Sequence, residues 1–539
     1  MKRTMKIKTL LVAAGFACAA ISCDDITDLN VNPSFPTEVS PVSLIAPIQQ
    51  QMARGIQFDS RYLGSYTQYH SVSTAGNVWD RLGYSQNTDA GGEIWRMTYF
   101  AMGLNITRLQ EGAIEAQRYD ILGASKAMRA WSWQVTTDYH GDLLKFDQVF
   151  TQRLTFDYDN QETAYAEVQK VCADALADLA RTDGGVNASY MAQGDKVYSG
   201  DRSKWIKFVN GILARNANNI SNKSTYNPDK VIGFVDKAMA SSADDFVIKF
   251  NGNITDDSNF YGPLRNNWSS FRQTDFIVRA MDGSIFTGAI DPRMARVLAP
   301  SVGSSETAPA SAANPDPTKY TYNGNPLNTL AATTGTSRIP NLWGTYSVGL
   351  STDIGRYLFR NNVDFPIMTY VEMQFIKAEA QFRKGDKAAA LITYKNAVSN
   401  SIDFVNKYTI ARTTFPITTA ISAAEKAAFL ANVNLIPTDN TKLTLSMIMM
   451  QKYVALYGFG YLETWTDMRK ARYGTDIYPT LNTVPNPANG GLFLDNNGKL
   501  PYRVRPRYNS EYVWNFGALQ AIGGDKIDYH TVEMWFMQP

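Results

Sequence analysis

Hydrophobic positions follow a helical period along much of the chain, most regularly between residues 366 and 404. Apolar residues recur in the first part of this stretch at three- and four-residue steps: Met368, Val371, Phe375, Ala378 and Phe382. This spacing places them on one face of a helix. We expect the helix to begin at Pro366, because the backbone N–H that proline lacks has no intrahelical partner at the first helical position. We expect it to end at Gly385, since glycine readily adopts the left-handed conformation.

A second helix is predicted to follow directly, with Asp386 as its N-cap. Its buried face would carry Ala390, Tyr394, Ala397 and Val398. Together with Gly385 and Asp386, this pattern resembles the turn and second helix of a tetratricopeptide repeat, in which small alanines allow close helix packing. The alternative is an ordinary helical hairpin. One repeat cannot bury its own apolar face, so further helices should surround it.

Hydrophobic periodicity and composition divide the rest of the chain into helical and irregular parts. Helices are expected over about 40–57, 92–116, 120–139, 161–180, 203–220, 229–240, 443–457 and 461–472. Residues 246–351 are rich in Asn, Gly, Ser, Pro and Thr, which predicts a loop-rich insertion with short strands. We therefore expect a single body over 40–539, with a helical scaffold at 40–245 and 352–475 and an irregular region at 476–539. The predicted fold class is mainly α: tetratricopeptide-like helical hairpins with a loop-rich, short-strand binding face.

The N-terminal 22 residues have the features of a secretory signal peptide. The basic residues Lys2, Arg3, Lys6 and Lys8 come first, and the apolar stretch at 9–20 that follows is too short to span a bilayer. The segment ends with a small residue before Cys23, which resembles a bacterial lipoprotein cleavage site. Cys23 would then be acylated, and residues 23–39 would form an extended lipidated tether. The alternatives are cleavage before Cys18, or a plain signal peptide in which Cys23 is incidental.

Composition narrows the class of protein further. The chain has 539 residues and a formal charge of +2, and the basic start accounts for that excess. This balance argues against a nucleic-acid partner. Of three cysteines, two lie in the N-terminal segment, so Cys172 alone cannot form a disulfide framework in the body. We expect Cys172 to be a small buried hydrophobe on a helix.

No catalytic or metal-binding motif stands out. The three histidines are far apart, and neither an HExxH motif nor a paired-cysteine spacing occurs. The stretch from Asp138 to Asp142 contains His140 and looks like a catalytic cluster. A polar helix end with Gly141 as its C-cap is the favoured interpretation. Nucleophile-elbow, Walker and dinucleotide motifs are missing as well. We predict no catalytic residues, no metal and no cofactor.

Aromatic residues in the loop-rich parts are candidate ligand-binding groups. Sugar rings stack on Trp and Tyr, and their hydroxyls bind amide and guanidinium groups. The first candidate cluster is Tyr66, Tyr69, Trp79, Arg81 and Tyr84. The second contains Asn266, Asn267, Trp268 and Arg272, and the third Tyr320, Tyr322, Trp343 and Tyr346. Core packing is the commoner role for each aromatic residue, and we assign it to Trp95, Trp131, Trp133 and Trp465.

Four stretches, taken in order, resemble the SusD/RagB family of Bacteroidetes outer-membrane lipoproteins, in the SusD-like branch with an Asn-Pro-rich start. They are CDD followed by LNVNP at 23–33, KAMRAWSWQVTTDYHGDL at 126–143, PIMTYVEMQFIKAEAQFRKGD at 366–386, and residues 447–473 with PYRVRPRY at 501–508. The resemblance spans nearly the whole chain. It departs at residues 140–144, His-Gly-Asp-Leu-Leu, where relatives usually read Tyr-Gly-Asp and a proline-containing turn.

This resemblance implies a fold and a function. Members are mostly helical, lack enzymatic activity, and lie on the extracellular face of the outer membrane as lids on SusC-like TonB-dependent transporters. They capture glycans, or in some cases peptides. Our leading hypothesis is therefore a lipid-anchored nutrient-binding protein with an oligosaccharide or peptide ligand. The alternatives are an extracytoplasmic glycan or peptide hydrolase, and a structural lid subunit without its own ligand.

Overall fold

The structure is a computed structural model that describes residues 40–301, 321–333, 337–344, 355–411 and 418–539. The expected signal peptide, the tether with Cys23, and the candidate ligand residues Tyr320 and Tyr346 lie outside these ranges.

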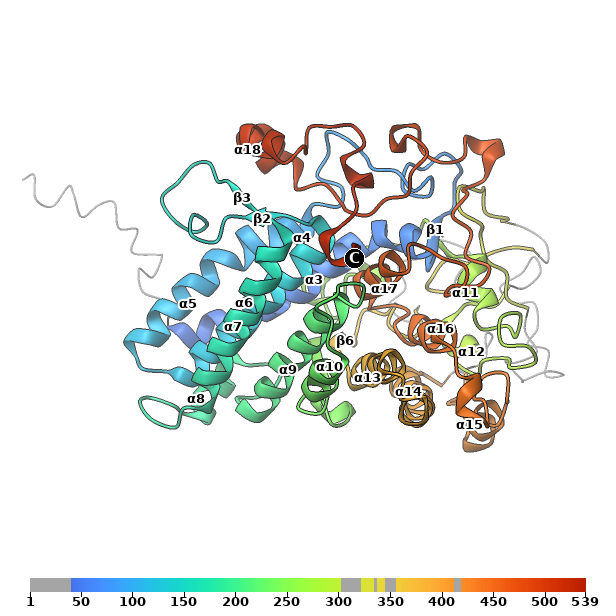
Figure 1. Cartoon of the computed structure of the whole chain (residues 1–539), viewed down its shortest axis with the longest axis horizontal. Helices are drawn as coiled ribbons and strands as arrows, with labels where there is room; N and C mark the ends of the chain where they lie inside the picture. Colours follow the sequence, from blue (N-terminus) through green and yellow to red (C-terminus); the bar gives the residue numbers. More distant parts are fainter. Residues whose placement is uncertain (1–39, 302–320, 334–336, 345–354, 412–417) are drawn as a thin grey trace, which may run out of the picture.

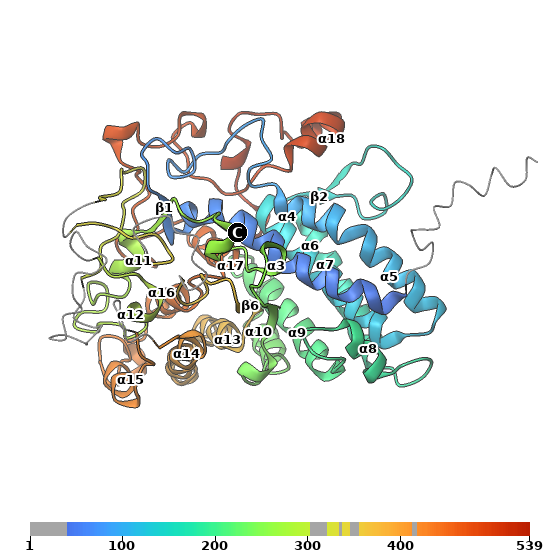
Figure 2. The ribbon, with the colours of Figure 1, turned by 180° about the vertical axis from the view of Figure 1, so that it is seen from behind.

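A curved row of helices forms the body of the molecule (Figure 1). In order of contact, the row contains α5 (Gly103–Glu115), α6 (Tyr119–His140), α7 (Gln161–Ala180), α9 (Arg202–Asn219), α10 (Pro228–Val235), α13 (Tyr370–Lys384), α14 (Lys387–Tyr408) and α16 (Leu445–Ala455). The long helix α3 (Pro41–Thr67) crosses this row and packs on α5 and on α17 (Tyr461–Lys470) (Figure 2). The predicted mainly helical fold class is confirmed.

Shorter elements complete the fold. The remaining α-helices that the structure describes are α4 (Glu93–Arg96), α8 (Ala188–Gly194), α11 (Asp275–Arg279), α12 (Met294–Val297), α15 (Ala423–Leu430) and α18 (Phe516–Ala521). Among the described residues, strands form three antiparallel pairs: β1 (His70–Val72) with β5 (Phe271–Gln273), β2 (Leu143–Leu144) with β3 (Tyr158–Asp159), and β4 (Phe246–Phe250) with β6 (Val363–Met368). Loops and the C-terminal segment cover the upper side in Figure 1.

The α13–α14 hairpin matches the prediction except at its start. Gly385 ends α13 with φ +90°, Asp386 caps α14 by accepting from the Ala389 N–H, and the predicted inward residues of α14 are all buried. The expected opening at Pro366 is wrong. Pro366 lies in strand β6, where it pairs with Val247, and a two-stranded sheet tolerates its missing N–H at an edge. Thr369 caps the helix instead.

Helix α3 continues to Thr67, past the expected end near residue 57. Two glycines inside it serve close packing and leave the helix unbroken. A Cβ atom on Gly64 would lie 1.9 Å from the His70 ring, and one on Gly55 would lie 2.3 Å from the sulfur of Met97. These glycines therefore let neighbouring segments approach the helix backbone.

Other helix boundaries also differ from the prediction. The helix expected over 92–116 is divided into α4, a π-helical turn η2 (Met97–Ala101) and α5. Helix α10 ends at Val235, before the expected residue 240. Helices α6, α7 and α9 agree with prediction within one residue at each end. Cys172 is buried on α7, where burial raises the pKa of its thiol, as expected for a structural cysteine.

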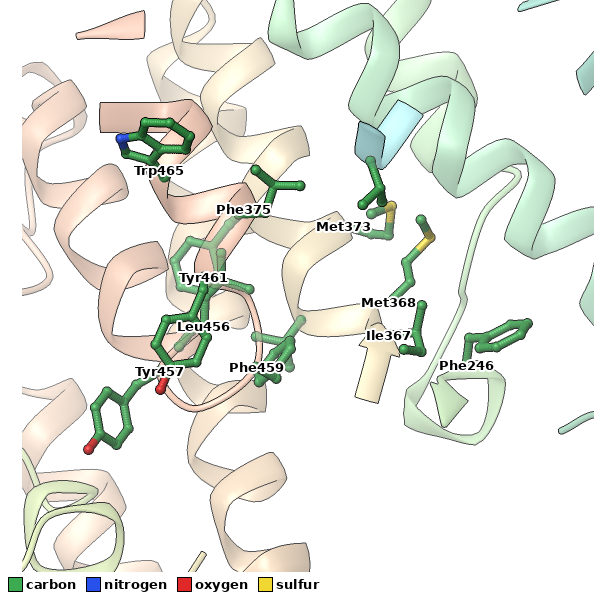
Figure 3. Close-up of a cluster of buried hydrophobic side chains, with 14 of the residues drawn as sticks. Phe246, Ile367, Met368, Met373, Phe375, Leu456, Tyr457, Phe459, Tyr461 and Trp465 are labelled. Atoms are coloured by element: carbon green, nitrogen blue, oxygen red, sulfur yellow. The ribbon is translucent and has the colours of Figure 1, made fainter. Parts of the chain in front are cut away.

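One hydrophobic cluster extends through the body, and Figure 3 shows its part between α13, α17 and the β4–β6 pair. Phe246 of β4, Met368 of β6 and Phe375 of α13 are fully buried there. The predicted core tryptophans Trp95, Trp131, Trp133 and Trp465 are all buried.

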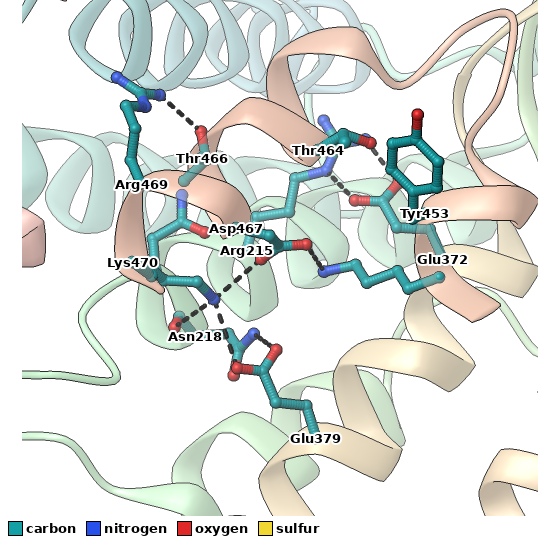
Figure 4. Close-up of polar contacts among 12 residues, drawn as sticks. Arg215, Asn218, Glu372, Glu379, Tyr453, Thr464, Thr466, Asp467, Arg469 and Lys470 are labelled. Carbon is teal, nitrogen blue, oxygen red and sulfur yellow. Dashed lines mark hydrogen bonds and ion pairs between the residues drawn. The ribbon is translucent and has the colours of Figure 1, made fainter. Parts of the chain in front are cut away.

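Charged side chains also connect the helices inside the body (Figure 4). Arg215 of α9 forms two 2.6 Å hydrogen bonds to Glu372 of α13 and a 2.9 Å ion pair with Glu463 of α17. Beside it, Lys470 contacts both Asp467 and Glu379. A cavity of about 20 Å³ adjoins Arg215, which is room for about one water molecule.

Candidate functional site

The aromatic residues of the first predicted cluster are core residues. The rings of Tyr66 and Tyr84 pack against Trp79, and Tyr69 stacks on Tyr453; all four members of the cluster that carry rings are buried. Arg81 donates to the carbonyl oxygens of residues 490–492 and so fastens two loops together. The ring faces needed for sugar stacking are therefore covered by protein in this structure.

The second and third clusters meet, but they meet inside the core. Trp268 and Trp343 both contact Tyr261: the Trp268 ring lies 4.5 Å from the Tyr261 ring, and the Trp343 indole N–H donates to the Tyr261 carbonyl at 2.7 Å. Tyr322 is buried as well. Arg272 is partly buried, which lowers its pKa to about 10, and it donates to the Ser269 carbonyl. Asn266 is exposed. As in the first cluster, the described aromatic residues Trp268, Tyr322 and Trp343 are packed in the core.

The polar end of α6 is also structural. Asp138 accepts a 2.5 Å hydrogen bond from the Tyr165 hydroxyl, and burial raises its pKa to about 6. His140 is buried against the Val504 carbonyl, and burial lowers its pKa to about 3. Gly141 follows with φ +93° as the helix cap. The side chains of Asp138 and His140 are both buried.

An open cavity lies elsewhere, beside α4, the β2–β3 pair and the chain before α18. These elements are in the upper left of Figure 1. Its volume is about 420 Å³, within the usual range for ligand sites. The lining residues come from three separate segments: Trp95, Arg96, Tyr99 and Phe100; Leu144, Leu154 and Phe156; and Arg507, Ser510, Glu511, Trp514 and Asn515. We call it the aromatic cavity.

Large apolar side chains stand exposed at the rim of the aromatic cavity. The exposed fractions are 75% for Trp514, 67% for Phe100 and 92% for Leu154. Deeper in the wall, Trp95 is buried and its ring lies 4.6 Å from that of Tyr99. Exposed aromatic groups around a hollow usually mark a binding surface, because a monomer gains nothing by leaving them in water.

Buried polar contacts fix the wall in place. Glu511 accepts from the Trp95 indole N–H at 3.1 Å and from the Tyr158 hydroxyl at 2.5 Å. Burial raises the pKa of Glu511, and these hydrogen bonds oppose the rise. Asn515 holds the loop after β2 by bonding both the N–H and the carbonyl of Phe156, at 3.0 and 2.9 Å. The three segments are therefore joined by specific bonds, which preorganises the cavity.

Two π-helical turns border the aromatic cavity: η2 (Met97–Ala101), which carries Tyr99 and Phe100, and η10 (Tyr508–Tyr512), which carries Ser510 and Glu511. Turns of this kind are rare and recur at functional sites, because the wider turn reorients side chains.

A smaller cavity, of about 210 Å³, lies on the other side of η10. Its lining residues are Tyr84, Gln86, Asn87, Thr88, Arg505, Tyr508, Tyr512, Phe516 and Asp525. Between the two cavities, Asp89 accepts from the Arg507 guanidinium at 2.5 Å and from the side-chain amide of Asn509 at 2.8 Å. We call the cavity of about 210 Å³ the second cavity.

The sequence reasoning missed both cavities because their aromatic residues lie in a region predicted only to be irregular. The run Tyr-Asn-Ser-Glu-Tyr-Val-Trp-Asn-Phe at 508–516 has four aromatic residues among amide and acidic ones. That density in a polar, non-periodic segment is the signal that would have indicated a surface site.

Within the described residues, no helix has both the length and the apolar character needed to cross a bilayer. The same residues contain no group of three or more His, Cys, Asp or Glu side chains placed to hold a metal ion.

Solved structures similar to this one share its fold. A SusD/RagB family protein from Bacteroides thetaiotaomicron is 20% identical, with a TM-score of 0.67 over 93% of this chain and 99% of that one. A chitin-binding protein is 18% identical, with a TM-score of 0.69 over 93% and 100% of the two chains. A SusD homologue from Bacteroides fragilis is 16% identical, with a TM-score of 0.68 over the same shares. No match is found among curated proteins.

The family model described as "Starch-binding associating with outer membrane" matches residues 33–506. This match covers most of the sequence and agrees with the shared fold. The chain therefore belongs to the SusD/RagB family of nutrient-binding proteins that associate with the outer membrane.

Proposed function

We propose that this protein binds a saccharide nutrient through the aromatic cavity. The observation that carries the proposal is the Trp514 indole, which is 75% exposed at the mouth of a preorganised hollow. Sugar rings present C–H faces that pack on such an indole, and the guanidinium of Arg507 and the hydroxyl of Ser510 offer partners for hydroxyl groups. The family description and the chitin-binding relative support the same ligand class.

Binding is favoured over hydrolysis by the acids around the cavity. Glycoside cleavage requires two carboxyl groups that flank one bond. Among the described residues that line the aromatic cavity, Glu511 is the one acid, and its two oxygens already accept hydrogen bonds from Trp95, Tyr158 and Asn515. The carboxyl group of Glu511 therefore has a structural role in the cavity wall.

Replacement of Trp514 tests the proposed site. We expect Trp514→Ala to weaken saccharide binding about tenfold or more, since an aromatic anchor contributes well over 1 kcal/mol at a binding surface. Isothermal titration calorimetry with malto-oligosaccharides and chito-oligosaccharides measures the change. The variant should keep its thermal midpoint, because the side chain is exposed.

The matched control is Ile392→Ala, which removes an exposed apolar side chain from α14, outside both cavities. Its affinity should equal that of wild type. Equal affinities for wild type and Trp514→Ala would remove the aromatic cavity from consideration. Turnover of a saccharide during the titration would favour the hydrolase alternative.

We further propose that the protein is acylated at Cys23, faces the cell exterior, and passes its ligand to a SusC-like TonB-dependent transporter. The basic and apolar start of the sequence and its family membership support this placement. Digestion by added proteinase on intact cells is the expected result, and full protection would contradict it. Copurification with the transporter and no saccharide binding would favour a structural lid subunit.

A further inference from the structure

The aromatic cavity and the second cavity share one wall. Residues 505–516 form it, and residues on its two sides face different cavities. Arg507, Glu511 and Trp514 line the aromatic cavity, whereas Tyr508, Tyr512 and Phe516 line the second. The opposite walls come from two nearby stretches of the sequence: the second cavity is lined by Tyr84, Gln86, Asn87 and Thr88, and the aromatic cavity by Trp95, Arg96, Tyr99 and Phe100.

The top of the shared wall is apolar and open. Val513, Trp514 and Phe516 are exposed by 48%, 75% and 44%. The shared wall therefore gives each cavity an exposed aromatic ring, Trp514 for the aromatic cavity and Phe516 for the second. The π-helical turn η10 separates the cavities, and an extended chain that crosses it can contact both rings.

Hydrogen bonds and ring stacking hold the shared wall in place on both sides. Asp89 binds both Arg507 and the backbone N–H of Asn509, the latter at 2.9 Å. On the side of the second cavity, Tyr512 donates to the Gly524 carbonyl at 2.7 Å, and Tyr508 stacks on Tyr512 with ring centroids 5.5 Å apart. Because these contacts hold the wall between the two cavities, an extended saccharide can bind along it without reordering the protein.

We propose that the two cavities are successive subsites for one extended oligosaccharide, which crosses the shared wall over Trp514 and Phe516. This inference rests on the proposed function and adds to it the ligand's length and its second contact surface. The larger aromatic cavity holds the part of the ligand that short saccharides occupy. The second cavity, with Gln86, Asn87 and Thr88 as hydrogen-bonding groups, holds the continuation of the chain.

Titration with oligosaccharides of increasing length tests this arrangement. Malto- and chito-oligosaccharides from disaccharide to octasaccharide are titrated into wild type, Trp514→Ala, Phe516→Ala and the Ile392→Ala control. Affinity should rise with length and then reach a plateau. Phe516→Ala should weaken binding of the longest saccharides about tenfold and leave the shortest ones unchanged, whereas Trp514→Ala should weaken both. Thermal midpoints confirm that the variants are folded.

The outcomes separate this inference from the proposed function. Binding that depends on Trp514 but not on length or on Phe516 leaves the proposed function intact and overturns the two-subsite arrangement. No binding of any saccharide contradicts both. Length-dependent binding of peptides in place of saccharides would overturn the assigned ligand class.

Discussion

Replacing Arg215 by methionine is expected to lower the free energy of unfolding by about 3–5 kcal/mol, because it leaves the carboxylates of the buried Glu372 and the partly buried Glu463 without their cation. Arg215 forms a bidentate pair with Glu372, an ion pair with Glu463 and a 2.9 Å hydrogen bond to the Ile367 carbonyl. These contacts connect α9, α13, α17 and β6. Urea titration followed by circular dichroism measures the loss.

The loss should grow with pH. Burial raises the pKa of Glu463 to about 7 even with Arg215 present, and removal of the guanidinium raises it further. A carboxyl group with a raised folded-state pKa keeps a proton that the unfolded chain has released, so its contribution to stability falls as pH rises above the unfolded value of about 4.3. The deficit of Arg215→Met should therefore be larger at about pH 8 than at about pH 5.

Two further variants identify the cause. The exposed pair Lys170–Glu167 provides the control: Lys170→Met should stay within about 0.5 kcal/mol of wild type. Combining Arg215→Met with Glu372→Leu and Glu463→Leu should restore most of the stability, since no unpaired charge remains buried. If the triple variant is as unstable as Arg215→Met, lost packing and not the uncompensated charges is responsible.

Local signals explain how much of the fold could be predicted. The α13–α14 hairpin is marked by apolar spacing, by Gly385 and by the Asp386 cap, all within the segment itself. The start of α13 depends instead on β4, which captures Pro366 and its neighbours in a strand from more than a hundred residues away. No periodicity within 363–368 indicates that partner, so propensity alone assigns these residues to the helix.

The candidate site was harder to predict because exposure is a tertiary property. Tyr66 and Trp514 are both aromatic residues near polar loops, and composition treats them alike. Tyr66 is buried because α17 packs on α3 and brings Trp465 to 5.1 Å from its ring. Trp514 is exposed because Glu511 and Asn515 bond inward and leave the indole outside. Those contacts join distant parts of the chain.

Trp465→Ala is expected to cost about 3–5 kcal/mol of unfolding free energy, because it empties a fully enclosed site in the core. The indole packs on Tyr66 and beneath the Arg469 guanidinium, 3.8 Å from the ring centroid, and its N–H donates to the Tyr473 hydroxyl at 2.7 Å. Figure 3 shows its place at the edge of the buried cluster. Urea titration gives the loss directly.

Trp465→Phe should cost less, because it keeps most of the packing and loses chiefly the hydrogen bond to Tyr473, worth about 1 kcal/mol. Comparison with Trp514→Ala then separates the two roles of tryptophan in this protein. Trp465→Ala should lower stability and leave saccharide affinity unchanged in the molecules that remain folded, whereas Trp514→Ala should do the reverse. Wild-type stability of Trp465→Ala would mean that the ring is not enclosed. Because Trp465 packs on Tyr66, this result would also contradict the assignment of the first aromatic cluster to the core.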